Sequence, residues 1–474
     1  MKTVITIFIF LSCSIASGQR ILTLEESISI AMGESYSIKS AEQSLVSSQM
    51  NLEAIKMGLR SSVDLEFDLP RYSRSLSSQF NTTIGTEQFF EVGNTTIEGR
   101  LSITQPILFT NGTLSISGSV FGRDQFSGLT GTSRDYFSNV GIRLQQPLFV
   151  FNTQAANLDR AEINLEKTQR QYNQAEKDII YNVTSSFYYL FRSKKNVEIT
   201  KEKVAQTEIS YNTAVNKFKA GLIPEVEMLQ LEVDLAASKN ELLNAEQLFE
   251  EAKNEFKLLI GLNLSEKIDV TADLKYLPVE INTEEAIGNA LKHRSDILNV
   301  EADITLSKMN IDQVESQSTI RADITANYGI NKNDEQFDNI FNNFEDTRSV
   351  VMTVSIPVWD WGKNAKEVES AEAGHNLNLL RYQNLKEQIV KEVLSAINKL
   401  NSAKARVEVL SKSVDVAVKS YEINLERFKS GNITSFDLSQ MQLKLTDSKI
   451  NSLNAMIDYQ IALADLERKT FKEY

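Results

Sequence analysis

The spacing of hydrophobic residues predicts two unusually long helices. Over residues 156–219 and 366–429 the apolar positions are mostly three, four or seven residues apart, which is typical of an amphipathic or coiled-coil helix. At about 1.5 Å per residue, each stretch corresponds to a rod of roughly 95 Å. The chain has six prolines, so such helices can run without interruption. Shorter helices are expected over residues 25–60, 225–260, 284–319 and 435–470.

A second pattern, alternation of apolar and polar residues, predicts strands between each opening helix and the following rod. It is clearest over residues 320–330 and 350–358, and it also occurs within residues 62–148. Strands that are apolar outward and polar inward are typical of membrane barrels, although a half-buried soluble sheet alternates in the same way. Aromatic residues follow the strands, where an interfacial girdle would lie: Phe149, Phe151, Trp359 and Trp361.

The order of helix, strands, rod and return helix occurs twice, which indicates an internal duplication. The predicted repeats are residues 19–265 and 266–474. The opening helices match at an offset of 259 residues and the later parts at 210, so the first repeat carries 49 extra residues. Around residues 98–121 this excess predicts another strand pair, which would either enlarge a barrel or form an accessory hairpin. Pairs matched at the offset of 210 include Pro147/Pro357, Tyr211/Tyr421, Phe218/Phe428, Gly221/Gly431 and Leu235/Leu445.

Each rod is predicted to end at a glycine, Gly221 or Gly431. Glycine readily adopts the left-handed conformation that closes a helix C-terminus. Pro224 suits the start of the next helix, and Thr434 or Ser435 can cap its counterpart. Basic residues before the glycines suit the negative helix ends: Lys217, Lys219, Arg427 and Lys429.

Residues 1–18 are typical of a signal peptide, with Lys2, an apolar core and small residues before a mature start near Gln19. The single cysteine, Cys13, lies in this leader, so the exported chain is expected to have no thiol, disulfide or cysteine-based metal site. Lipoprotein processing at Cys13 is the alternative. No other segment has 18 consecutive apolar residues, so crossing a membrane would require a closed barrel.

Composition excludes several classes of function. The net charge of -13 argues against a nucleic-acid groove, which needs a basic surface. The two histidines, His293 and His375, form no metal constellation, and the sequence has no P-loop and no glycine-rich dinucleotide turn. We therefore expect no enzymatic activity, no cofactor and no metal site.

The chain resembles the TolC-like outer-membrane efflux protein family over essentially the whole mature sequence. The resemblance rests on the two-fold repeat, on the strand-to-rod junctions Gln146–Phe149 and Ile356–Trp359, and on the tip turns Tyr211–Gly221 and Tyr421–Gly431. It implies a mainly α fold with a β-barrel part. Three identical chains would share one outer-membrane barrel, with two strand pairs each and twelve strands in total, and duplicated coiled coils would form a periplasmic tunnel.

The resemblance also implies partners and site residues. The homotrimer would contact outer-membrane lipid and serve a tripartite efflux or type I secretion system, passively conducting solutes exported by an inner-membrane transporter. A periplasmic adaptor protein would dock on the helix tips, at Phe218, Gly221, Phe428 and Gly431. Family members narrow the closed tunnel with acidic residues six and nine positions after the second glycine. Here these are Asp437, which matches, and Gln440, which departs.

Two other functions remain compatible with the sequence. One is a periplasmic or surface coiled-coil scaffold without a pore, whose strands would form a soluble cap. The other is a passive diffusion porin, which the long helices disfavour because porins consist mainly of strands.

Overall fold

The computed structural model describes residues 20–82 and 84–474. The predicted leader, residues 1–18 with Cys13, lies outside the described residues. The chain divides into two compact units. The helical unit contains residues 20–44, 169–298 and 383–474, and the sheet unit contains residues 45–168 and 299–382.

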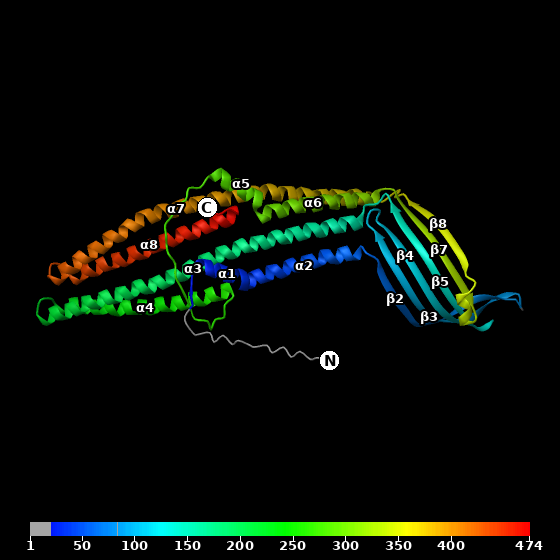
Figure 1. The fold of residues 1–474 in the computed structure, drawn as a ribbon, viewed down its shortest axis with the longest axis horizontal. Coiled ribbons are helices and arrows are strands. Elements are labelled where there is room, and N and C mark those ends of the chain that lie inside the picture. Colours follow the sequence, from blue (N-terminus) through cyan, green and yellow to red (C-terminus); the bar gives the residue numbers. More distant parts are fainter. Residues whose placement is uncertain (1–19, 83) are drawn as a thin grey trace, which may run out of the picture. The chain divides into compact units, whose positions relative to one another are not determined.

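The sheet unit contains one six-stranded antiparallel sheet (Figure 1). The strand order is β2-β3-β4-β5-β7-β8, so the strands of the two repeats join directly where β5 pairs with β7. A 3-10 helix, η2 (Phe337–Phe341), follows β7. The strands are β2 (Ser62–Asn81), β3 (Thr86–Ile107), β4 (Gly112–Ser127), β5 (Gly131–Leu148), β7 (Arg321–Asp334) and β8 (Glu345–Ser355).

The register places apolar residues of all six strands on one face of the sheet. Leu65 pairs with Leu101 on the neighbouring strand, and Ile324 pairs with Met352. Successive residues of a strand point to opposite faces, so the residues between them form a polar face. The apolar face carries large exposed side chains: Val63, Leu65, Phe67, Leu101, Ile116, Val140, Ile142, Tyr328, Val350, Met352 and Val354.

The extra residues of the first repeat are part of this main sheet. The predicted strand pair within residues 98–121 corresponds to β3 and β4, which lie between β2 and β5. The expectation of two strand pairs per chain is therefore wrong, and the sheet has three. Most of the polar segment 79–94 is strand, because β2 continues to Asn81 and β3 begins at Thr86, directly after Gly85 with its φ of 72°.

Four long helices follow the strands and form two hairpins (Figure 1). In the first repeat these are α3 (Thr153–Lys219) and α4 (Glu225–Ile260), where the sequence predicted 156–219 and 225–260. In the second repeat they are α7 (Lys363–Lys429) and α8 (Ser435–Thr470), where it predicted 366–429 and 435–470. Each rod has 67 residues, and each return helix has 36. None of the helices in the described residues is both long enough and apolar enough to cross a membrane.

The opening helices are broken, which the sequence analysis did not predict. Residues 25–60 form α1 (Leu24–Glu34) and α2 (Tyr36–Gly58), and residues 284–319 form α5 (Thr283–His293), α6 (Ser295–Glu315) and the 3-10 turn η1 (Ser316–Ser318). Ser35 and Arg294 have extended ψ angles of 140° and 132°, and they correspond at the offset of 259. The Ser35 hydroxyl accepts a hydrogen bond from the Ile38 N–H, so the residue ends one helix and caps the next.

The core of the helical unit lies around a two-stranded parallel pair, β1 (Arg20–Leu22) and β6 (Ile268–Val270). α1, α3 and α4 pack on this pair with fully buried side chains such as Phe187 and Phe256. A second buried cluster lies near the tips of the long helices: Ala214, Leu231, Tyr421, Phe428, Leu438 and Leu445.

Candidate functional site

Both helix tips are closed by the same backbone motif. At the first tip, the Gly221 N–H donates to the Phe218 carbonyl and the Leu222 N–H to the Lys217 carbonyl, each at 2.9 Å. At the second, Gly431 and Asn432 repeat these two bonds at 3.0 and 2.9 Å. The φ angles of Gly221 and Gly431 are 70° and 79°. Each turn is a Schellman motif, in which the glycine supplies the left-handed residue.

The two predicted tip phenylalanines differ in burial. Phe428 is 0% exposed, whereas Phe218 is 37% exposed. The buried Lys217 explains the difference, because its ammonium donates to the Phe428 carbonyl and lies 4.3 Å from the centre of the Phe428 ring. Lys217 lies in the last turn of α3, as expected, and it also binds the carbonyl end of α7, which sequence analysis did not predict.

Polar side chains join the two hairpins below the tips. The Ser210 hydroxyl hydrogen-bonds to the Tyr421 phenol, and burial raises the pKa of that phenol. On α8, the Gln442 amide donates to the Thr207 hydroxyl at 2.8 Å and to the Lys203 carbonyl at 3.0 Å. These contacts form a junction between the repeats within one chain. Sequence analysis missed Gln442, although its position on the inner face of α8 at helical spacing from Leu438 and Leu445 could have suggested it.

The predicted constriction residues lie in the first turns of α8. Asp437 is exposed and takes part in a capping box with Thr434. Its carboxylate accepts hydrogen bonds from the Thr434 N–H at 3.2 Å and the Thr434 hydroxyl at 2.9 Å, and its own N–H donates to that hydroxyl at 3.2 Å. Gln440 is half-buried, one turn further along. Thr434, and not Ser435, is therefore the cap, and Asp437 has a local structural role whatever else it does.

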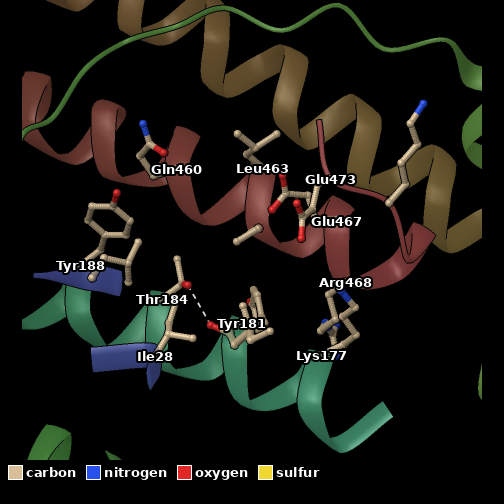
Figure 2. A pocket seen from close by; sticks show the side chains of 14 residues that line it. Ile28, Lys177, Tyr181, Thr184, Tyr188, Gln460, Leu463, Glu467, Arg468 and Glu473 are labelled. Atoms are coloured by element: carbon tan, nitrogen blue, oxygen red, sulfur yellow. Dashed lines mark hydrogen bonds between the residues drawn. The ribbon is translucent and has the colours of Figure 1, made fainter. Parts of the chain in front are cut away.

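A cavity of about 200 Å³ lies between α3 and α8, far along α8 from the tip residues. Figure 2 shows Tyr181, Thr184 and Tyr188 of α3 facing Gln460 and Glu467 of α8. Burial raises the pKa of the Glu467 carboxyl above its ordinary value. A hydrogen bond from the Tyr474 N–H lowers the same pKa, but by less.

The wall of this cavity is held by ionic contacts. Arg468 donates to Asp178 at 3.1 Å and to Asp465 at 3.0 Å, and its guanidinium lies 4.7 Å from the centre of the Tyr181 ring. Burial by itself would raise the pKa of the Asp465 carboxyl. Hydrogen bonds from Lys469 and Arg468 have the larger effect together and leave that pKa below its ordinary value. The cavity therefore belongs to the packing of α3 on α8.

The described residues contain no group of three or more histidine, cysteine, aspartate or glutamate side chains that could hold a metal ion. His375 hydrogen-bonds through Nδ1 to the Ser307 hydroxyl at 2.8 Å. The contacts described at the tips are those of packing and helix capping, beside exposed surface.

The sequence matches the family model described as outer membrane efflux protein over residues 27–262 and 286–470. The two matched segments lie within the two predicted repeats, residues 19–265 and 266–474. The chain is 22% identical to the outer membrane protein TolC of Vibrio cholerae over 343 residues, which are 70% of this chain and 76% of that protein. It is 19% identical to the solvent efflux pump outer membrane protein SrpC of Pseudomonas putida over 331 residues, which are 69% of this chain and 70% of that protein.

Solved structures share the fold. The outer membrane channel CmeC of Campylobacter jejuni superimposes with a TM-score of 0.72 at 15% identity, and the match covers 94% of this chain and 85% of that one. At such low identity the likeness concerns the arrangement of helices and strands, a mainly helical protein with a sheet.

Proposed function

The chain belongs to the outer membrane efflux protein family, and we propose that three copies of it form one export duct of a tripartite efflux or type I secretion system. Membership makes the protein an outer-membrane efflux channel and not an enzyme. The number of copies, the partners and the residue roles below are our proposal.

The sheet is the observation that carries the proposal. Its apolar face is exposed, and β2 and β8 each have one side without a strand partner in the described sheet. In hydrocarbon every backbone N–H and C=O needs a partner, so a sheet with two free edges requires closure. Three copies of six strands would close with eighteen strands, not twelve, and barrels of about 16–18 strands leave an aqueous channel.

The exposed aromatic residues after the strands fit a membrane interface. Phe149, Trp359 and Trp361 are exposed, and the two tryptophan rings lie 5.4 Å apart in an edge-to-face arrangement. Aromatic side chains are enriched at the boundary between lipid and water. We assign these residues to contact with outer-membrane lipid.

The helix tips are proposed to face a periplasmic adaptor that links the duct to an inner-membrane transporter. SrpC is by its name a component of a solvent efflux pump, which supports such a partnership. Of the four predicted docking residues, Gly221 and Gly431 fix the turns, Phe218 offers an exposed edge, and Phe428 acts through packing because it is fully buried. Exposed apolar side chains beside the tips would add contact area: Leu222, Val226 and Phe436.

Asp437 and Gln440 are proposed to line the narrowest part of the closed tunnel. Three Asp437 carboxylates in a ring would attract cations and repel anions. Because Asp437 also caps α8, the two roles need separate variants. Asp437→Asn keeps an oxygen acceptor for the cap and removes the charge, whereas Thr434→Ala removes the cap and keeps the charge.

Planar-bilayer recording of the purified protein tests the whole proposal. We expect ion-conducting channels, with block by divalent cations weakened in Asp437→Asn and retained in Thr434→Ala. If divalent cations block Asp437→Asn as strongly as the wild type, the proposed Asp437 ring is wrong, while the channel proposal still stands. A monodisperse single chain that inserts into no bilayer would support the scaffold and overturn the channel.

A further inference from the structure

The apolar face of the sheet contains a hollow. It has a volume of about 700 Å³ and lies over β2, β3, β4 and β5 in the sheet unit. Residues directly opposite each other on neighbouring strands share a face, so the register places the lining of the hollow on the apolar face, the face of Leu65. Six lining residues form two rows across the strands, with Phe67, Gly99 and Val120 in one row and Ile97, Gly122 and Tyr136 in the next.

Two glycines form part of the floor of the hollow, and two aromatic rings form its sides. A Cβ added to Gly99 would lie 3.2 Å from the Phe67 ring, and one added to Gly122 would lie 3.2 Å from the Tyr136 ring. The ring from β2 and the ring from β5 therefore lean toward each other over the two strands between them. Rings that cover glycines stabilise a sheet, but this role does not account for the open volume between the rings. Glycine inside a strand is also typical of a place that a ligand approaches closely.

The 3-10 helix η2 borders the hollow beside β5. The Ser138 hydroxyl donates to the Ile340 carbonyl at 2.5 Å, and Ile340 is fully buried. Ser138 lies two residues from Tyr136 and thus on the same face, so η2 packs on the apolar face of the sheet. Phe337 of η2 lines the hollow, and its ring meets the Tyr136 ring edge-to-face at 5.5 Å. The hollow therefore has a third aromatic side.

An ion pair lies at one end of the hollow. Arg134 donates to both carboxylate oxygens of Asp124, to one of them at 2.6 Å, and both residues line the hollow. They stand opposite each other on β4 and β5, near the turn between Ser127 and Gly131 and at the end of β5 away from α3. Charged side chains on a lipid-facing surface are costly in the middle of a bilayer and nearly neutral at its boundary. In the proposed channel, the ion pair therefore lies where the hydrocarbon ends.

We propose that the hollow binds one acyl chain of an outer-leaflet lipid, with the lipid headgroup beside Asp124 and Arg134. This inference rests on the proposed channel, in which the apolar face lies in hydrocarbon and the helix tips face the periplasm. β3, β4 and β5 lie inside the sheet, so copies that join through β2 and β8 leave the hollow facing lipid. A lipid has an apolar length and a polar end, which matches the apolar lining and the charged end of the hollow.

Native mass spectrometry of the full-length protein tests this site. The protein is purified in a mild detergent, washed free of lipid and mixed with dipalmitoylphosphatidylethanolamine. Ile97→Trp places a larger side chain in the hollow, and Val120→Phe fills it from the floor. The matched control is Ile116→Trp, because Ile116 is also exposed on the apolar face but does not line the hollow. The spectrum gives the number of chains and the number of bound lipids in the same measurement.

We expect the wild type and Ile116→Trp to retain one lipid per chain, and Ile97→Trp and Val120→Phe to lose it while still forming trimers. Equal retention in all four proteins would overturn the site, as would a loss in Ile116→Trp, because retention would then belong to the whole face. A wild-type trimer that retains no lipid overturns the site and leaves the channel proposal standing. A protein that stays a single chain and inserts into no bilayer overturns the channel as well.

The ion pair provides a test of the headgroup position. Arg134→Gln leaves the Asp124 carboxylate without its partner, and this carboxylate should repel the lipid phosphate and lower retention. Adding Asp124→Asn removes the charge and should restore retention. If Arg134→Gln retains as much lipid as the wild type, the headgroup does not lie beside this pair.

Discussion

The two helix tips have the same backbone and different surroundings. Gly221 and Gly431 close their turns with the same pair of hydrogen bonds, yet Phe428 is enclosed and Phe218 is open to solvent. The turn depends on a few neighbouring residues, which the duplication copied. Burial depends on the other repeat, and within one chain only the second tip receives the side chain that covers it, Lys217. A duplicated chain can thus assign different roles to equivalent residues without changing their identity.

The largest effect should come from removing the enclosed ring. Phe428→Ala leaves a cavity in the tip cluster and should lower the free energy of unfolding by about 3–5 kcal/mol. Phe218→Ala should cost much less, because its ring is partly solvated in the single chain. Chemical denaturation of the detergent-solubilised protein, followed by circular dichroism, compares the two. Equal losses would mean that the two tips have similar surroundings.

An intermediate and equal effect is expected from the glycines. Alanine at either position must adopt the left-handed conformation, which costs an L-residue about 1–2 kcal/mol. No neighbouring atom lies within 4 Å of the added Cβ at either glycine, so backbone conformation alone sets the cost. The same denaturation curves should show Gly221→Ala and Gly431→Ala shifted by similar amounts. A clear difference between them would contradict the equivalence of the two turns.

A smaller effect concerns the caps, where the tips differ in sequence. Thr434→Ala removes the side-chain cap of α8 and should cost about 1 kcal/mol. At the first tip Pro224 occupies the cap position without a side-chain hydrogen bond, and Glu227 stands three residues later. Pro224→Ser would create a capping box with Glu227 and should stabilise α4 by less than about 1 kcal/mol. Thermal unfolding should show a lower melting temperature for Thr434→Ala and a higher one for Pro224→Ser. Lower melting temperatures in both variants would contradict the expected difference between the caps.

The smallest effect lies at the far end of α8, where Glu467 stands at the place of Lys257. Burial raises the pKa of Glu467, so its contribution to stability is fully present below the carboxyl's unfolded pKa and is lost as pH rises through the folded pKa. Glu467→Gln should therefore match the wild type at low pH and become the more stable of the two as pH rises toward neutral. Melting temperatures of the two proteins between pH 4 and 8 test this prediction. A difference in melting temperature that stays constant over that range would show that ionisation of Glu467 is not its cause.

Local signals in the sequence explain the parts of the fold that could be predicted. The ends of α3 and α7 follow from Gly221 and Gly431, and the faces of the strands follow from alternation, because both depend on adjacent residues. The breaks at Ser35 and Arg294 carry a weaker local signal: neither residue is a proline or a glycine, and the serine that caps α2 belongs to a residue type that also occurs inside helices. A serine or arginine in the middle of an apolar helical pattern is compatible with a continuous helix, and packing of the helical unit decides otherwise.

Which strands lie side by side was harder to predict than which face of each strand is apolar. Alternation identified the strands now seen as β3 and β4, but it does not say which strand lies beside which, so their place in the main sheet stayed open. The partner of Lys217 is likewise 211 residues away in the chain. The roles of Phe218, Gly221, Phe428, Gly431, Asp437 and Gln440 in docking and constriction remain predictions, because they concern partners and copies outside a single chain.

The free edges of β2 and β8 also bear on how the protein is made. A chain entering the bilayer alone would carry two rows of unpaired backbone groups into hydrocarbon, each group costing several kcal/mol. In the proposed channel, insertion and association would therefore have to proceed as a single event. The rate of assembly would then depend steeply on the local concentration of newly exported chains. A chaperone that shields the apolar face of unassembled chains would increase that rate.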